Sequence, residues 1–192
     1  MKGTLKGFIL GVIATIGVAG LAAFLVGTTG HITMRADIVP TAFESSMAMR
    51  MMDANVELNA PKTPNPAQPT DENLVAGATI YLKRCSECHG DPSQPESKLA
   101  KTLYPPPPQF ITDAPDMEEN ENYYIILHGV RWTGMPGWKN ELSDQQIWQV
   151  VTFLSHMDKL PPAAKSVFGP SANAPAAAPP TKPMKKMPKM KM

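Results

Sequence analysis

The longest run of hydrophobic residues lies near the start of the chain, where no residue between positions 7 and 30 carries a formal charge. Its most apolar part, residues 8–26, would span about 28 Å as a helix, close to the hydrocarbon thickness of a bilayer. Lys2 and Lys6 precede the run and are expected to stay on the cytoplasmic side. Residues 1–30 are therefore predicted to form a transmembrane anchor, with the rest of the chain on the extracytoplasmic, periplasmic side.

A cleaved signal peptide is the alternative to a retained anchor. Gly20 and Ala22 offer small residues at the two positions that a signal peptidase examines. The apolar stretch is longer than the core of a usual signal peptide, which favours retention.

Small residues also recur at every fourth position of this segment. Such a stripe lets two membrane helices pack backbone against backbone, so we expect the anchor to dock against another transmembrane helix. The stripe consists of Gly3, Gly7, Gly11, Thr15, Ala19, Ala23 and Gly27.

Apolar residues at helical spacing predict three further helices. The first covers residues 72–84 and is capped by Asp71; the second covers about 118–128, with Asp116 at its start and Gly129 as its stop. The third covers residues 143–157, with Ser143 as the cap and an apolar stripe of Ile147, Val150, Val151 and Leu154.

Gly77 lies on the apolar face of the helix predicted for residues 72–84. A glycine inside a helix costs roughly 1 kcal/mol relative to alanine, so its presence needs a reason. Close approach of a second helix is the usual one, and the helix predicted for residues 143–157 is the candidate.

The proline distribution separates the folded part from its flanks. Many of the 21 prolines lie in residues 61–69, 105–108 and 161–188. Residues 31–70 are predicted to be a juxtamembrane stalk, with a possible helix over 43–56 followed by an extended, semi-rigid, proline-rich linker. Residues 161–192 are poor in large apolar side chains and are predicted to be a disordered tail. The folded domain would then cover residues 71–160.

Charge is distributed unevenly along the chain. The net charge of +1 combines +7 in the last 34 residues with −6 in the rest, and residues 71–158 alone carry −7. An acidic surface can steer a basic redox partner, although a merely solvated face is an equal alternative. The basic tail is expected to dock on an acidic partner, on anionic lipid or on the acidic domain itself.

The chemistry of the chain centres on Cys85-Ser86-Glu87-Cys88-His89. Two thiols three positions apart, followed by an imidazole, form the attachment pattern of a c-type haem, in which both cysteines bond to vinyl groups and the histidine binds iron. A structural disulfide or a thiol redox pair is the alternative. No other cysteine is present, so no disulfide framework is expected.

The chain resembles the class I monohaem cytochromes c over roughly residues 71–158. In that family a glycine and an aromatic residue precede the first haem cysteine by eight and four positions, as Gly77 and Tyr81 do here. The resemblance implies an all-α cytochrome c fold of three to four helices around one covalent haem c. It also implies that Gly77 and Tyr81 pack against Val150 and Phe153.

The resemblance further implies a methionine ligand in the loop before the last helix, where Thr133-Gly134-Met135-Pro136 lies. Gly134 lets the backbone approach a porphyrin, and Pro136 keeps Met135 out of helical geometry. Met135 is thus the expected distal ligand, and the iron ligands are His89 and Met135. The alternatives are Met117 or Met157, or a bis-histidine site that uses His128 or His156.

Residues around the ligands are assigned more loosely. The N–H groups of Arg131, Trp132 and Trp138 are candidates for the haem propionates. In the family a proline carbonyl accepts the histidine N–H, but the position expected for it holds Lys98, with Pro95 nearby. Residues 105–108, which lead to Phe110, resemble a proline-rich turn that lines the haem edge, with a rigid surface loop as the alternative.

These features predict a membrane-anchored carrier of single electrons, because an iron with both axial positions filled leaves no vacancy for a substrate. We expect redox proteins as partners, within a respiratory or photosynthetic membrane complex, and neither nucleic acid nor a small-molecule substrate. A haem enzyme or gas sensor with a dissociable Met135 is the alternative, and a haem-free thiol oxidoreductase is a third.

Overall fold

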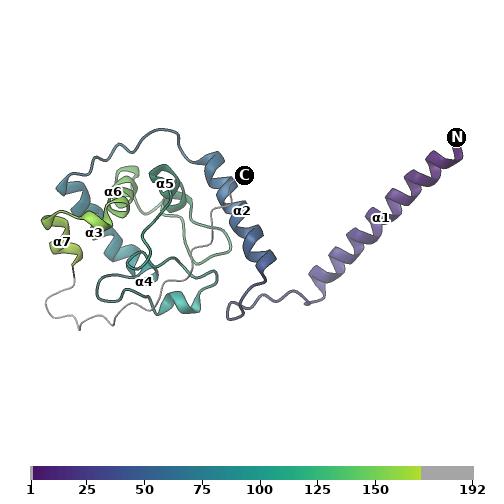
Figure 1. Cartoon of the computed structure of the whole chain (residues 1–192), viewed down its shortest axis with the longest axis horizontal. Helices are drawn as coiled ribbons and strands as arrows, with labels where there is room; N and C mark the ends of the chain where they lie inside the picture. Colours follow the sequence, from purple (N-terminus) through teal and green to yellow (C-terminus); the bar gives the residue numbers. More distant parts are fainter. Residues whose placement is uncertain (1, 170–192) are drawn as a thin grey trace. The chain divides into compact units, whose positions relative to one another are not determined.

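The computed structural model describes residues 2–169 and divides into two compact units, with the division after Arg35. Helices and loops make up the described residues, which contain no strand and one isolated bridge between Asp91 and Gln94. The helices are α1 (Lys2–Thr28), α2 (Ala42–Asn59), α3 (Asp71–Arg84), α4 (Ser86–His89), η1 (Leu99–Thr102), α5 (Glu119–His128), α6 (Asp144–Ser155), η2 (Met157–Lys159) and α7 (Pro162–Phe168) (Figure 1). The all-α prediction is confirmed.

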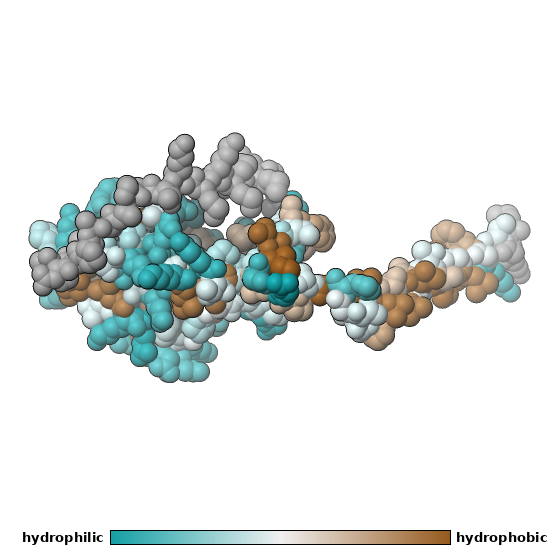
Figure 2. All heavy atoms as spheres, turned by 90° about the horizontal axis from the view of Figure 1, so that it is seen from below, coloured by the Kyte–Doolittle hydropathy of each residue, from teal (hydrophilic) through white to brown (hydrophobic). Residues whose placement is uncertain are grey.

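The first unit contains α1, which is a continuous helix as predicted. Residues 4–28 are long and apolar enough to cross a bilayer, and apolar colour covers much of this helix in Figure 2. Thr15 Oγ1 donates a hydrogen bond to the carbonyl of Gly11 within the helix, at 2.9 Å. A Cβ atom at Gly11 would meet open space, with none of the described residues beyond the helix backbone within 4 Å. The docking role of the small-residue stripe stays a prediction.

The second unit is organised by the crossing of α3 and α6. A Cβ atom at Gly77 would overlap the carbonyl oxygen of Gln149 and would lie 2.7 Å from Cβ of Phe153. The two backbones are therefore in contact, and only glycine fits between them. This confirms the predicted reason for a glycine inside the helix.

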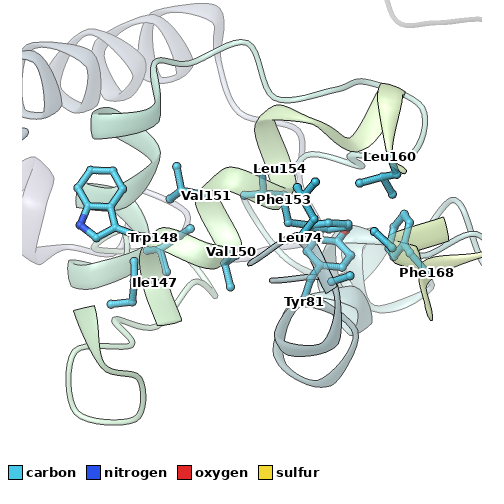
Figure 3. Packing of buried hydrophobic residues seen from close by; sticks show 13 residues of the cluster. Leu74, Tyr81, Ile147, Trp148, Val150, Val151, Phe153, Leu154, Leu160 and Phe168 are labelled. Carbon is cyan, nitrogen blue, oxygen red and sulfur yellow. The ribbon is translucent and has the colours of Figure 1, made fainter. Parts of the chain in front are cut away.

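The hydrophobic core extends from this crossing. Tyr81 on α3 and Phe153 on α6 lie with ring centroids 5.4 Å apart, and Leu74 packs beside them (Figure 3). At the other end of α6, Trp148 stacks on Tyr123 of α5 at 4.1 Å. The helix α6 thus contacts both α3 and α5 along its length, which explains why nearly every residue of its last two turns is buried.

The helix ends follow the sequence with small differences. Ser143 caps α6 as predicted, and Gly129 ends α5 with φ of 71°. The cap of α3 is Thr70 rather than Asp71, since the Thr70 hydroxyl accepts from the N–H of Asn73. The helix α5 begins after Glu118, whose N–H donates to the Glu121 carboxylate, and not at Asp116.

The segment predicted as an extended spacer lies on the folded domain instead. Val56 and Ala60 at the end of α2 are buried, and the Tyr124 hydroxyl donates to the Asn55 side chain at 3.2 Å. Further along, the Asn65 amide donates to Thr152 Oγ1 at 2.9 Å, and the Thr152 hydroxyl contacts the Ala67 carbonyl. Polar anchors between the prolines hold the segment on α5 and α6, and its stiffness stays a prediction.

The prediction of disorder from residue 161 is wrong at its beginning. Pro162 occupies the first position of α7, where proline is favourable, and alanines continue the helix. Phe168 is 7% exposed and lies against Tyr81 and Phe153, at centroid distances of 5.6 and 4.8 Å. Leu160 and Ala164 are buried with Phe168, so this stretch joins the hydrophobic core. Residues 170–192 lie outside the described residues.

Candidate haem site

The motif Cys85–His89 forms a single helical turn directly after α3. Cys85 ends α3 with φ of −116°, α4 follows, and Gly90 ends α4 with φ of 82°. The N–H groups of Cys88 and His89 both donate to the Cys85 carbonyl, at 3.1 and 2.9 Å. Cys85 and Cys88 are free thiols in this turn and form no disulfide with each other. The turn presents both thiols and the imidazole within five residues.

The orientation of His89 is fixed by the proline-rich loop that follows. Its Nδ1 lies 2.9 Å from the carbonyl oxygen of Pro108, and its ring stacks on Phe110 with centroids 4.5 Å apart and an interplanar angle of 3°. The proline carbonyl of the family is therefore present, at Pro108 and not near the position held by Lys98. Since Nδ1 is held by Pro108, Nε2 is the nitrogen that remains for iron.

Four consecutive carbonyls, three in the motif and one on Gly90 directly after it, accept hydrogen bonds from residues outside the motif. The Glu87 carbonyl accepts from the Ser97 hydroxyl, and the Cys88 carbonyl accepts from the Gln109 amide. The His89 carbonyl accepts from the N–H of Phe110, and the Gly90 carbonyl accepts from the Tyr81 hydroxyl at 2.7 Å. The carbonyls of this turn cannot all be paired within so short a helix, so the surrounding chain pairs them.

The sequence pattern pointed to Tyr81 for packing only, and it did not single out Ser97 or Gln109. Both were missed because a serine and a glutamine in a loop are common solvent-facing residues. The one signal available was their position between the motif and Phe110, within a segment too rich in proline to supply backbone donors.

Burial sets the protonation of these groups. It raises the pKa of the Cys85 thiol to about 12 and also raises the pKa of Cys88. A thiol redox pair needs a lowered pKa, so this environment disfavours the thiol oxidoreductase alternative. Burial lowers the pKa of His89 despite the opposing effect of its bond to Pro108, which keeps the imidazole neutral, as an iron ligand must be.

Met135 lies in a loop that is pinned to the end of α5. The N–H of Val130 donates to the Met135 carbonyl at 3.2 Å, and the N–H of Met135 donates to Thr133 Oγ1 at 3.0 Å. Gly129 makes this possible, because a Cβ atom there would lie 2.7 Å from the Met135 carbonyl oxygen. Met135 is partly buried and packs against the core.

Gly134, next to Met135, packs against Leu103, which a Cβ atom would approach to 3.1 Å. A glycine beside the methionine allows the close backbone approach that a flat porphyrin needs. Cys85, Cys88 and His89 therefore fit the attachment of a haem, and the role of Met135 as the distal ligand stays a prediction.

The alternative ligands have other partners. His156 ends α6, and its Nδ1 lies 2.9 Å from the Thr152 carbonyl. The His128 ring contacts Tyr124 at 4.7 Å. Met157 packs against the hydrophobic core. Local contacts thus account for these three side chains.

The candidate propionate partners differ in exposure. Trp132 is 83% exposed and has φ of 61°, an uncommon backbone conformation for a non-glycine residue. Trp138 is partly buried, and the Arg84 guanidinium lies 5.8 Å from its ring centroid. Arg131 is exposed. Their role toward propionates stays a prediction.

Comparison with known proteins places this domain. Residues 72–154 match the family described as cytochrome c oxidase, cbb3-type, subunit III. Among solved structures, a chain of the reducing HAO-like protein complex of Kuenenia stuttgartiensis is similar at 24% identity and a TM-score of 0.40. That similarity covers 49% of this chain and 48% of the other, so the chain spans about half the length of that neighbour. No curated protein sequence matches the chain.

The helical fold, the attachment motif and the family match together define a c-type cytochrome domain, which carries covalently bound haem c. The attachment motif occurs once in the 192 residues. Residues 72–154 therefore form a c-type cytochrome domain with one haem attachment motif, and an apolar helix precedes this domain in the chain.

Proposed function

We propose that this protein is a membrane-anchored carrier of single electrons with histidine and methionine as axial ligands. Thioether bonds from Cys85 and Cys88 would attach the haem, His89 would bind iron through Nε2, and Met135 would bind it through the thioether sulfur. Haem c supplies a one-electron exchange between ferrous and ferric iron. The chain supplies a fixed orientation for both ligands.

The bond between His89 Nδ1 and the Pro108 carbonyl is the observation that carries the proposal. It selects the tautomer with the proton on Nδ1 and directs Nε2 away from the loop. An imidazole held in this way cannot swing out to act as a general acid or base. Together with a partly buried Met135, this arrangement supports electron transfer rather than substrate chemistry.

We also propose that α1 is retained as the membrane anchor, with the haem domain on the extracytoplasmic side and with α1 packed against a helix of a larger respiratory or photosynthetic complex. Its length, its lack of charged residues from Gly7 to Thr28 and the small-residue stripe support this. Membrane fractions should retain the protein after a high-salt wash. Replacement of Gly11 and Thr15 by leucine should reduce co-purification of the partner in mild detergent, whereas replacement of Leu10 and Val12 by isoleucine should not.

Ligation is tested by comparing Met135→Ala with Met117→Ala. The ferric charge-transfer absorption band of an iron–thioether bond should disappear only in the Met135 variant. The reduction potential of that variant should fall by on the order of 0.1 V, a modest part of the roughly 0.8 V over which axial ligands set haem potentials. Absence of the band in the wild-type protein at neutral pH would favour the enzyme or gas-sensor alternative. If the measured mass of the wild-type protein equals that of the polypeptide alone, no haem is attached and the proposal fails.

A further inference from the structure

Three consecutive residues, Pro108, Gln109 and Phe110, all contact the haem motif. The outer two touch His89 itself, through the Pro108 carbonyl and the Phe110 ring. The Gln109 side chain lies between these contacts and reaches the motif's backbone, where its Nε2 donates to the Cys88 carbonyl at 2.9 Å.

The same amide group also makes a hydrogen bond within the proline-rich loop and another to the segment around Ser97. Gln109 Nε2 donates a second hydrogen bond to the Pro107 carbonyl at 2.9 Å, and its Oε1 accepts from the N–H of Ser97 at 2.6 Å. All three of these side-chain hydrogen bonds are to backbone groups. Gln109 therefore joins the proline loop, the haem motif and the segment around Ser97 at one point.

The composition of the loop explains why a side chain has this task. Residues 105–108 are all proline, and proline has no N–H group. The loop can present carbonyls but cannot donate a backbone hydrogen bond to the Cys88 or Glu87 carbonyls beside it. The Gln109 amide supplies the missing donors: one N–H bond reaches the Cys88 carbonyl of the motif and the other the Pro107 carbonyl of the loop. They add to the backbone bond from Phe110 to the His89 carbonyl.

We propose that Gln109 is a positioning residue for the axial histidine, because its amide fixes the Pro108 carbonyl opposite His89 Nδ1. This inference rests on the proposed function, in which His89 binds iron. The hydrogen bond from Nδ1 increases the electron donation of an imidazole to iron. A looser loop weakens that bond and thereby disfavours ferric iron, so loss of the Gln109 amide raises the reduction potential.

Two variants separate the contacts of this side chain. Gln109→Leu removes both donors and the acceptor at similar volume. Gln109→Glu keeps an acceptor for the N–H of Ser97 but cannot donate to the Cys88 and Pro107 carbonyls while ionised. Gln94→Leu is the matched control, since Gln94 is an exposed glutamine in the loop before Ser97. If Gln109→Leu does not assemble, Gln109→Glu still tests the donors.

The experiment uses the full-length haem protein in detergent and measures solvent exchange of the His89 Nδ1–H by proton NMR, together with the reduction potential. Exchange should be about fivefold faster in both Gln109 variants, the factor that corresponds to one net hydrogen bond. The potential should rise in Gln109→Leu. In Gln109→Glu the added negative charge favours ferric iron and opposes that rise, so this variant is assessed by exchange alone. Gln94→Leu should match the wild-type protein in both measurements.

Unchanged exchange in the Gln109 variants would overturn the inference, and so would a shift in potential without faster exchange. The inference would also be overturned if Gln94→Leu changed the exchange rate and the potential as much as Gln109→Leu does. The wild-type spectrum distinguishes this failure from failure of the proposed function. If His89 does not bind iron, the wild-type protein shows no histidine N–H resonance shifted by the ferric iron, and no comparison of variants is needed.

Discussion

Single residues at close contacts determine where the backbone of this domain can go. Gly77 is the clearest case, because the space that a side chain would need is taken by the Gln149 carbonyl and by Phe153. Both neighbours belong to the middle of α6 and cannot yield without shifting a helix. The crossing of α3 and α6 therefore requires a residue without a Cβ atom at position 77.

Gly77→Ala should lower the free energy of unfolding by about 1–3 kcal/mol, the usual cost of overpacking a core. This loss should exceed the benefit of alanine for helix propensity, which is about 1 kcal/mol. Urea unfolding of the haem protein measures it. Lys83→Ala, on the exposed side of the same helix, serves as the control and should change stability by less than about 0.5 kcal/mol.

Tyr81 links the core to the haem motif through its hydroxyl, which donates to the Gly90 carbonyl at 2.7 Å. Burial raises the pKa of Tyr81 well above its ordinary value of 10.0. The folded protein therefore holds the phenol proton more firmly than the unfolded chain does. The resulting stability is complete below about pH 10 and is lost as the pH rises further.

Tyr81→Phe should flatten the decline of stability at alkaline pH. Above pH 10 the wild-type protein should lose up to about 1.4 kcal/mol per pH unit more than the variant, because only the wild-type phenol ionises on unfolding. At pH 7 the variant should be less stable by roughly 0.5–1.5 kcal/mol, for the lost hydrogen bond. Unfolding curves between pH 7 and 11 measure both effects, and parallel curves would contradict the prediction.

At the scale of helices, the structure contains one helix, α7, in a segment whose composition predicted disorder. The helix α7 contains a single large buried side chain, Phe168, which packs against the Tyr81 and Phe153 rings. It closes the end of the core that the family match, which stops at residue 154, does not include. The folded domain thus continues past residue 160.

Phe168→Ala should destabilise the haem domain by about 3–5 kcal/mol, as for other buried aromatic residues. Val167→Ala is the control, since Val167 is exposed, and it should cost less than about 0.5 kcal/mol. A chain that ends at Gly169 should keep the wild-type melting temperature, whereas a chain that ends at Ser166 should not. Equal melting temperatures for the two shortened chains would show that α7 adds nothing to the core.

Helices were predictable to the extent that their signals are local. The Ser143 cap, the Gly129 stop and the apolar stripe of α6 all act within a few residues, and each prediction based on them is confirmed. The prediction for the tail failed because composition averages over many residues, and a few buried ones such as Phe168 place α7 in the core.

Part of the haem site was predictable for a similar reason. Cys85, Cys88 and His89 are close together in the chain, so their pattern is visible in the sequence. The partner of His89 was only partly predicted. The resemblance implied a proline carbonyl, but the position expected for it holds Lys98, and the contact comes from Pro108, 19 residues after His89. Every residue has a backbone carbonyl, so side-chain identity alone does not single out Pro108.

At the scale of the whole molecule, the second unit includes more than the haem domain predicted from the sequence. The helix α2 and the proline-rich segment after it are held on α5 and α6 by buried apolar residues and by long-range hydrogen bonds, such as that between Tyr124 and Asn55. Most of the expected spacer therefore belongs to the same compact unit as the haem domain.

Val56→Asp should release α2 without unfolding the haem domain, because Val56 is 3% exposed and a buried carboxylate has no partner there. Hydrogen exchange should show that amides of α2 lose protection while those of α3 and α6 keep theirs. Phe43→Asp, on the exposed side of α2, should leave both sets unchanged. Simultaneous loss of protection in α2 and α6 would mean that the two parts unfold together.

The late position of Phe168 has a consequence for how the protein is made. Tyr81 reaches its neighbours at positions 153 and 168 only after most of the chain has left the ribosome. At 5–20 residues per second, the 83 residues between Cys85 and Phe168 take roughly 4–16 s to synthesise. Until Phe168 is synthesised, the core that contacts Tyr81 beside the attachment motif cannot be complete, so the motif precedes its finished surroundings by that interval.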